Sequence, residues 1–427
     1  MIGRPLSRRS LLTLAAASGF APGRPAASAQ PAPGPAAWDP QPETRPTADV
    51  VAPDLLKGPH YALGPDVITF SYQNRYTATS DFGPFTAPSD ARLRRLIREI
   101  AAIAELKAMQ QTDAFQKAAI EAGKSPFHAA KNLIENPVET LSAIPQGIGS
   151  LFDRVNEQVR RSGKSQYEDD TAKSILAVSG FKRDYAAKLG VDVYSSNPVL
   201  QAELNRLAWA SAAGNLTLGA LSMVTGALVL QVASNVRMLE QARNIVAATP
   251  PSELSKRNRE ELRKIGIQDA AADRFLQNKM LSPRHQTIMV ASMLALGDIP
   301  GRTDFIAYAA KAESENQALL FQQMAEMQAG YSATVAPIRQ IAIFGNLPLA
   351  YTAKSRAVSL LPIDRLLWTE RNAAIAANLA TALPKPQRVK ATEIWLTGDA
   401  STLADAGLKK LGLGLVQHCG KQLPLLD

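Results

Sequence analysis

The sequence predicts a mainly α fold, in which a multi-helix domain is followed by a small C-terminal α/β module. Between residues 88 and 330, apolar residues recur every three or four positions, which is the period of helices that bury one face. Beyond residue 335, short strand-like runs alternate with helical stretches. The chain has 427 residues and is 46% hydrophobic, so it contains enough apolar material for two domains with buried cores.

The first 29 residues have the composition of a targeting segment. Arg8 and Arg9 directly precede a short, weakly apolar run, and Ala27-Ser28-Ala29 offers the small residues that a signal peptidase accepts. Paired arginines before such a run resemble the twin-arginine export signal of bacteria. This resemblance implies a protein that folds before it is exported to the periplasm and is cleaved near Ala29. Its expected partners are the twin-arginine export machinery and signal peptidase.

The net charge does not indicate nucleic-acid binding. The formal charge is +9, but the targeting segment carries four of the 47 basic residues and none of the 38 acidic ones, which leaves +5. This charge is spread along the chain without a stripe of basic and aromatic residues. We therefore expect no nucleic-acid partner.

The segment that follows the signal is rich in proline. Residues 30–60 predict an extended, semi-rigid arm, because few apolar residues separate the prolines. Residues 61–87 contain two β-like runs, 67–72 and 76–79, on either side of Gln73-Asn74-Arg75. They predict a short β hairpin or strap.

The predicted helical domain, residues 88–330, begins with Ser89 as N-cap. Its first turns carry four arginines, although cations are unfavourable near a helix N-terminus. These are Arg92, Arg94, Arg95 and Arg98. Either a bound phosphate or anionic lipid or, more simply, a solvated face explains them.

Later helices are expected at four places in this domain. Residues 254–265 end at Gly266, and residues 269–278 form the next helix. Another begins at Ser282-Pro283, and a long helix covers about 304–329 with Thr303 as its cap.

Two apolar segments of the helical domain stand out. Residues 126–161 keep near-helical spacing despite several prolines, which predicts short amphipathic turns over a core or a membrane surface. Residues 207–236 contain no charge, which predicts a buried central helix or a membrane segment. The candidate membrane or partner contacts in them are Phe127, Leu141, Ile148, Phe152, Leu218, Leu221 and Leu228.

The C-terminal module, residues 335–427, is predicted from alternating elements. Strands are expected at 338–344 and 347–352 around a Gly345-Asn346 turn, and again at 357–361, 390–396 and 413–417. Helices are expected at 364–383 and 401–411.

The search for catalytic motifs is mostly negative. The sequence has no His-Glu-x-x-His, no phosphate loop and no Gly-x-Ser-x-Gly, so no cofactor is indicated and no metal is expected. His285, Glu315 and Glu326 are weak catalytic candidates, because one histidine and two carboxylates on neighbouring helices resemble the ligands found in helical bundles. The stripe that contains both glutamates is more simply a solvated helix face; it consists of Asp304, Lys311, Glu315, Gln322 and Glu326.

Two positions in the C-terminal module also merit attention. Asp399 is a further weak catalytic candidate, because it follows a predicted strand, where α/β folds place ligands; Asp399 and Ser401 are more simply caps of the next helix. His418 and Cys419 are neighbours on a predicted strand and therefore point to opposite faces, which argues against a nucleophile–base couple. Cys419 is the only cysteine, so it is either buried or pairs between chains.

Together these observations favour an exported periplasmic protein with a binding or assembly role, including a membrane-peripheral version. The alternative is a periplasmic enzyme or cofactor carrier, exported folded, whose site lies between the helical domain and the α/β module.

Overall fold

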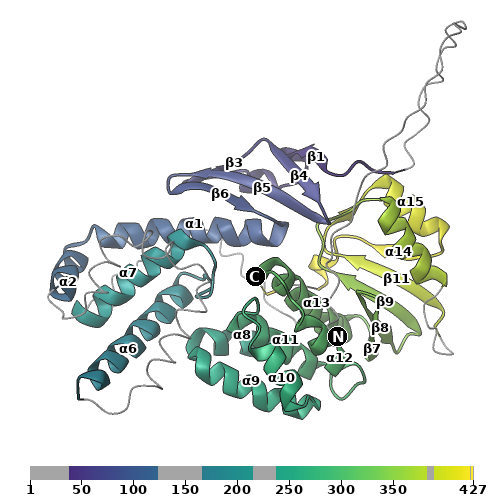
Figure 1. Cartoon of the computed structure of the whole chain (residues 1–427). Helices are drawn as coiled ribbons and strands as arrows, with labels where there is room; N and C mark the ends of the chain where they lie inside the picture. Colours follow the sequence, from purple (N-terminus) through teal and green to yellow (C-terminus); the bar gives the residue numbers. More distant parts are fainter. Residues whose placement is uncertain (1–37, 124–165, 215–236, 382–388, 424, 427) are drawn as a thin grey trace, which may run out of the picture. The chain divides into compact units, whose positions relative to one another are not determined.

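The computed structural model of the chain describes residues 38–123, 166–214, 237–381, 389–423 and 425–426 (Figure 1). Of the residues that the structure describes, 54% are helical and 20% are in strands, and these strands form three sheets. The predicted mainly α fold with only a small C-terminal α/β module is therefore wrong, because an antiparallel sheet precedes the helices. The architecture is α+β.

The N-terminal sheet has six strands in the order β1-β4-β5-β3-β2, with β6 also paired to β5. Every pair is antiparallel. Buried and exposed residues alternate along β4 and β5, as they do in a sheet with one face on a core. The strands are β1 Glu43–Pro46, β2 Lys57–Gly58, β3 Tyr61–Leu63, β4 Asp66–Phe70, β5 Gln73–Ser80 and β6 Gly83–Ala87.

Two of these strands, β1 and β2, lie within residues 30–60, where the sequence predicts an arm. The prolines there do not prevent a sheet, because they occupy strand ends and turns. Pro46 ends the edge strand β1, Pro53 begins a short 3-10 turn, and Pro65 directly precedes β4.

The predicted hairpin exists as β4 and β5, but its turn lies earlier than the sequence suggests. Ser71 and Tyr72 form the turn, and both have positive φ angles, of 48° and 74°. Residues 73–75 belong to β5 instead. The backbone carbonyl of Tyr72 accepts a hydrogen bond from the N–H of Asp364, so the turn lies against the C-terminal module.

Helix α1, Asp90–Gln110, starts where the sequence predicts. The Ser89 hydroxyl accepts a hydrogen bond from the N–H of Arg92, which confirms Ser89 as N-cap. One face of α1 packs on the sheet in a single apolar cluster. This cluster includes Val67, Tyr76, Leu93, Ile97 and Ile100. Burial of side chains of this size stabilises the fold by about 1.5–3 kcal/mol each, so the start of α1 is fixed against β5.

The remaining helices build two larger cores. Ile103, Leu106, Phe115, Tyr185 and Leu204 belong to the first, which joins α1 to α2, α6 and α7. The second joins α9 to α13 with the C-terminal sheet. The helices are α2 Asp113–Gly123, α6 Gln166–Lys188, α7 Pro198–Gly214, α8 Arg237–Ala248, α9 Pro251–Ile265, α10 Asp269–Leu276, α11 Pro283–Ala295, α12 Arg302–Ala309 and α13 Glu315–Thr334.

The single long helix expected over residues 304–329 is wrong, because the chain forms α12 and α13 there. The Nδ2 group of Asn278 donates hydrogen bonds to the carbonyls of Ala310 and Ala312, at 2.9 Å each, which holds the break between the two helices. Ser314 then caps α13 by accepting a hydrogen bond from the N–H of Gln317. The predicted starts near 254, 269 and 283 and the stop at Gly266 are confirmed.

The C-terminal module contains a five-stranded sheet in the order β13-β11-β9-β8-β7. β7, β8 and β9 are antiparallel, and β9, β11 and β13 are parallel. The Gly345-Asn346 hairpin is confirmed, and Gly345 has a φ of 60°. Its elements are β7 Ile338–Phe344, β8 Leu347–Thr352, β9 Arg356–Leu361, α14 Glu370–Thr381, β11 Ala391–Leu396, α15 Thr402–Lys410 and β13 Gly414–Val416.

One helix of this module starts later than predicted. Residues 364–369 do not join α14, because Arg365–Leu366 forms the short strand β10, which pairs in parallel with β12, Asp399–Ala400. This pairing leaves Asp364 just before β10, next to the N-terminal sheet.

The two segments with candidate membrane contacts fall largely outside the described residues. These include all of 126–161, residues 215–236, and the candidates Phe127, Leu141, Ile148, Phe152, Leu218, Leu221 and Leu228. Residues 207–214 end α7, where Leu207 and Ala210 are completely buried. Within the part of the chain that the structure describes, no helix is both long enough and apolar enough to cross a membrane.

Candidate functional site

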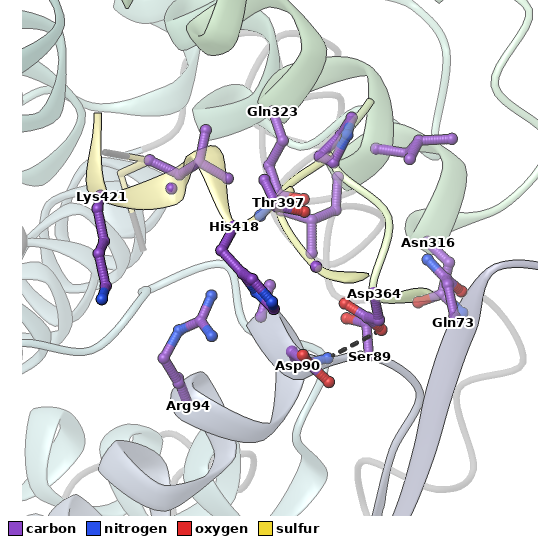
Figure 2. Close-up of a pocket in the computed structure, with 17 residues that line it drawn as sticks. Gln73, Ser89, Asp90, Arg94, Asn316, Gln323, Asp364, Thr397, His418 and Lys421 are labelled. Carbon is purple, nitrogen blue, oxygen red and sulfur yellow. Dashed lines mark hydrogen bonds between the residues drawn. The ribbon is translucent and has the colours of Figure 1, made fainter. Parts of the chain in front are cut away.

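A cavity of about 320 Å³ lies where the N-terminal sheet, α1, α13 and the C-terminal module meet (Figure 2). Its polar lining comes from segments that are far apart in the sequence. The labelled residues are Gln73, Ser89, Asp90, Arg94, Asn316, Gln323, Asp364, Thr397, His418 and Lys421. Binding pockets for small molecules typically start at about this volume.

Two aspartates form the acidic side of the cavity. Asp364 Oδ2 accepts hydrogen bonds from the backbone N–H groups of Asn74, at 2.9 Å, and Asp90, at 3.1 Å. Asp90 Oδ1 in turn accepts from the Tyr76 hydroxyl, at 2.5 Å, and from Asn74 Nδ2, at 2.9 Å. Asp364 therefore joins β5 to the N-terminus of α1, and Asp90 lies beside it.

The surroundings of Asp364 shift its pKa. Burial raises the pKa of Asp364 well above its ordinary value, and the neighbouring Asp90 raises it further. The two backbone N–H donors and the nearby Arg94 oppose this shift only in part. Burial also raises the pKa of Tyr76, with a further contribution from Asp90, so its hydroxyl remains a donor. The cavity thus contains a buried carboxyl group, Asp364, whose charged form is disfavoured.

Basic side chains also line the cavity. Figure 2 shows Arg94 and Lys421 in the left half of the view, Asp364 in the right half, and His418 between them. His418 has a φ of 53°, and its N–H donates to the carbonyl of Gly398 at 2.9 Å. This left-handed residue turns the chain, so that His418 lines the cavity while the adjacent Cys419 is buried in the core.

The four catalytic candidates from the sequence do not meet in one site. Glu315 forms an ion pair with Arg92 at 2.7 Å. Asp399 pairs with Arg365 at 2.8 Å and with Arg45 at 3.5 Å, while Ser401 alone caps α15. The Glu315 and Asp399 carboxylates therefore form ion pairs with arginines of distant segments of the chain.

Glu326 was expected on a solvated face, and that expectation is wrong. Glu326 and Gln322 are 1% and 0% exposed. Glu326 Oε1 accepts from Gln322 Nε2 at 2.6 Å, and its Oε2 accepts from the N–H of Leu426 at 2.5 Å. Glu326 thereby anchors the C-terminal segment. Among the residues that the structure describes, no group of three His, Cys, Asp or Glu side chains is placed to hold a metal ion.

The solvated-face interpretation of the α1 arginines is also wrong for two of them. Arg95 is 6% exposed, and the side chain of Arg92 is 10% exposed. The sequence signal for these buried arginines was the unfavourable placement of cations in the first turns of a helix. Asp90, Asp364 and His418 gave no comparable local signal, because their arrangement depends on contacts across the chain.

His285, the fourth candidate, has a structural role. Its Nδ1 accepts a hydrogen bond from the N–H of Ser282, whose hydroxyl accepts from the N–H of His285, so the two form a capping box for α11. Burial lowers the pKa of His285 to about 3, and the nearby Arg95 contributes. His285 is therefore neutral in the folded protein.

This histidine makes stability depend on pH. The unfolded chain binds a proton at His285 below about pH 6.5, whereas the folded chain does so only near pH 3, so acidification favours unfolding. Between these values His285 lowers the free energy of unfolding by about 1.4 kcal/mol for each pH unit of acidification.

Glutamine at this position also completes a capping box. We expect urea to unfold His285→Gln and the wild type at nearly the same concentration at pH 7.5. At pH 5.5, the free energy of unfolding of His285→Gln should exceed that of the wild type by about 1 kcal/mol. If the stability difference between His285→Gln and the wild type were the same at both pH values, the buried neutral state of His285 would be contradicted.

No family model, curated protein or solved structure matches the chain. The functional interpretation therefore depends on the cavity itself.

Proposed function

We propose that this chain is an exported protein that binds a small polar molecule in the cavity between α1, α13 and the C-terminal module. The observation that carries the proposal is that basic and acidic side chains line the same cavity. Figure 2 shows Arg94 and Lys421 toward one end of the view and Asp364 toward the other, and Asp90 lies one helical turn from Arg94. A ligand with an anionic group at one end and hydroxyl or amino groups at the other matches this arrangement.

The two ends of the ligand have different partners. A carboxylate of the ligand binds Arg94, because a guanidinium offers paired donors to two oxygens. A hydroxyl group at the other end donates to the Asp90 carboxylate and accepts from protonated Asp364, whereas an ammonium group there donates to Asp90. Gln323 and Thr397 lie between the two ends and supply neutral hydrogen-bonding groups. Amino acids and sugar acids have this chemistry and this size.

Export is supported by the sequence of the first 29 residues, with Arg8 and Arg9 before a weakly apolar run. Fractionation of cells that express the complete gene tests this part of the proposal. Recovery of the protein in the soluble periplasmic fraction would agree with ligand binding without membrane association. Release from membranes only by carbonate or detergent would indicate the membrane-peripheral version, and retention in the cytoplasm would contradict export.

Ligand binding is tested by thermal unfolding of the full chain with a panel of amino acids, sugar acids and neutral sugars. We expect at least one amino acid or sugar acid to raise the Tm saturably, by several degrees at about a hundred times its Kd. Arg94→Gln should weaken that binding about tenfold, because a charge-assisted hydrogen bond is lost.

Lys410→Gln is the matched control, since it removes one positive charge from α15 without changing the cavity lining. Its binding should equal that of the wild type. A panel without any saturable ligand, or equal binding by Arg94→Gln, would overturn the proposal.

The second candidate function is acid–base catalysis, which the raised pKa of Asp364 beside a second carboxyl group favours. In a hydrolysis, Asp364 would donate its proton to the leaving group while Asp90 accepts a proton from the attacking water. Turnover of nitrophenyl esters or glycosides that is lost in Asp90→Asn would favour this function. Binding without turnover would favour the first.

A further inference from the structure

A second cavity, of about 260 Å³, is lined by residues of α1, α6, α8 and α11 and has a strongly basic lining. Five arginines line it, from four helices that are separated in the sequence. They are Arg95 and Arg98 of α1, Arg183 of α6, Arg243 of α8 and Arg284 of α11. Asp192 is the one carboxylate among the described lining residues.

Asp192 does not balance this charge. Its Oδ2 lies 3.7 Å from Arg95 Nη1 and 3.6 Å from Arg284 Nε, so one oxygen is shared by two guanidiniums beyond hydrogen-bonding distance. Its Oδ1 accepts from the N–H of Tyr194 at 2.9 Å. Burial opposes ionisation of Asp192, but Arg284 and Arg95 together lower its pKa below the ordinary value. Among the described residues, Asp192 is thus an ionised carboxylate that lies between two of the five arginines, Arg95 and Arg284.

Two of the other arginines have partners among the described residues. Arg183 Nη1 donates to the neutral Ser179 hydroxyl at 2.7 Å. Arg243 pairs with Glu240 at 3.0 Å on the same helix, outside the cavity lining. Arg95 and Arg284 are each only 6% exposed, so solvent screens their charge poorly.

The groups around the cavity respond to this concentration of charge. Burial lowers the pKa of the Arg183 guanidinium, because desolvation disfavours its cationic form. The nearby His285 stays neutral for the same reason and because Arg95 lies close to it. An anion in the cavity would relieve this desolvation and repulsion.

We infer that this cavity is a separate binding site for a phosphoryl group. Guanidiniums that converge from four helices suit a tetrahedral dianion, which offers several oxygens in different directions to paired N–H donors. A flat monocarboxylate would engage fewer of them. The lining also includes the apolar residues Ala186, Ala187 and Val246, beside which a small organic group attached to the phosphate could pack. This site does not depend on the ligand proposed for the first cavity.

Two sources of a phosphoryl group fit the same chemistry. One is free phosphate or a small soluble phosphate ester, and the other is the headgroup of an anionic phospholipid. The experiment therefore uses inorganic phosphate and pyrophosphate in solution, and vesicles of phosphatidylglycerol with phosphatidylcholine vesicles for comparison.

The variants for the test are Arg183→Gln and Arg243→Gln in the full chain. Both residues are only partly buried and do not contact Asp192, so the variants should fold, which circular dichroism checks. Arg274→Gln is the control, because it removes the same charge from an exposed position on α10 outside the cavity.

By titration calorimetry at constant ionic strength, we expect saturable binding of phosphate or pyrophosphate that weakens about tenfold in each cavity variant. The control should remain within about twofold of the wild type. Binding to phosphatidylglycerol vesicles that the same two variants lose, and that pyrophosphate competes away, would support the headgroup as the source. Absence of both kinds of binding, or binding that Arg274→Gln reduces as much as the cavity variants do, would overturn the inference.

Discussion

Replacement of Asp364 by alanine should lower the free energy of unfolding by about 3 kcal/mol, because it removes the acceptor of two backbone N–H groups. Asn74 is 1% exposed, and its N–H has Asp364 Oδ2 as acceptor, as does the N–H of Asp90. A buried donor that loses its acceptor costs about 1–3 kcal/mol. Urea unfolding at pH 7 measures the loss.

The matched variant is Asp364→Asn, which should stay within about 1 kcal/mol of the wild type. An asparagine has the shape of a protonated aspartate, with a carbonyl that accepts from both N–H groups and an NH₂ that donates to Asp90. If asparagine were as destabilising as alanine, the carboxyl group would not be protonated in the folded protein.

The same variant should change the pH dependence. Because the pKa of Asp364 is raised in the folded protein, the unfolded chain releases this proton near pH 4 while the folded chain keeps it. The contribution of Asp364 to stability is therefore complete below about pH 4 and falls as pH rises through the folded pKa. The stability of Asp364→Asn relative to the wild type should rise over this range. His285 acts in the opposite direction, so the two groups partly compensate in the wild type between about pH 4 and 6.5.

Gly398→Ala should be at least as damaging, with a loss of about 3 kcal/mol or more. A Cβ at this position would lie 1.9 Å from the carbonyl oxygen and 2.4 Å from the carbonyl carbon of Asp364. These are backbone atoms, so no side chain can rotate away from the clash. The Asp364 carbonyl also accepts from the N–H of Asp399 at 3.1 Å, and the shift would break this bond between β10 and β12.

Gly420→Ala is the control for this prediction. Gly420 also lines the cavity, but no atom lies within 4 Å of a Cβ added there, and its backbone conformation suits alanine. We expect its Tm to remain within about 2 °C of the wild type. Near-wild-type stability of Gly398→Ala would show that the approach of β10 and β12 is not as close as described.

Local features of the chain could be predicted from the sequence. Ser89, Ser282 and Ser401 cap helices at the expected places, and Gly345-Asn346 forms the expected hairpin turn. Caps and tight turns depend on residues within three or four positions of each other. The prolines of residues 30–60 led to the wrong fold class, because the sequence does not show whether each proline lies inside a strand or at its end.

The candidate site depended on distant contacts. Asp90 and Asp364 are separated by 274 positions, and the pKa of Asp364 is raised only when the C-terminal module packs against β5 and α1. The stripe at 304–329 had the period of one helix, but Asn278 holds it as two. Glu326 was consequently assigned to solvent when it is buried.

By itself, then, the sequence determined the serine caps of α1, α11 and α15, the C-terminal hairpin and the expectation of export, because these follow from neighbouring residues. The tertiary structure alone decided the N-terminal sheet, the acidic pair in the first cavity and the arginines of the second. The physical reason is that burial and charge are properties of a position in space, to which residues far apart in the chain contribute together.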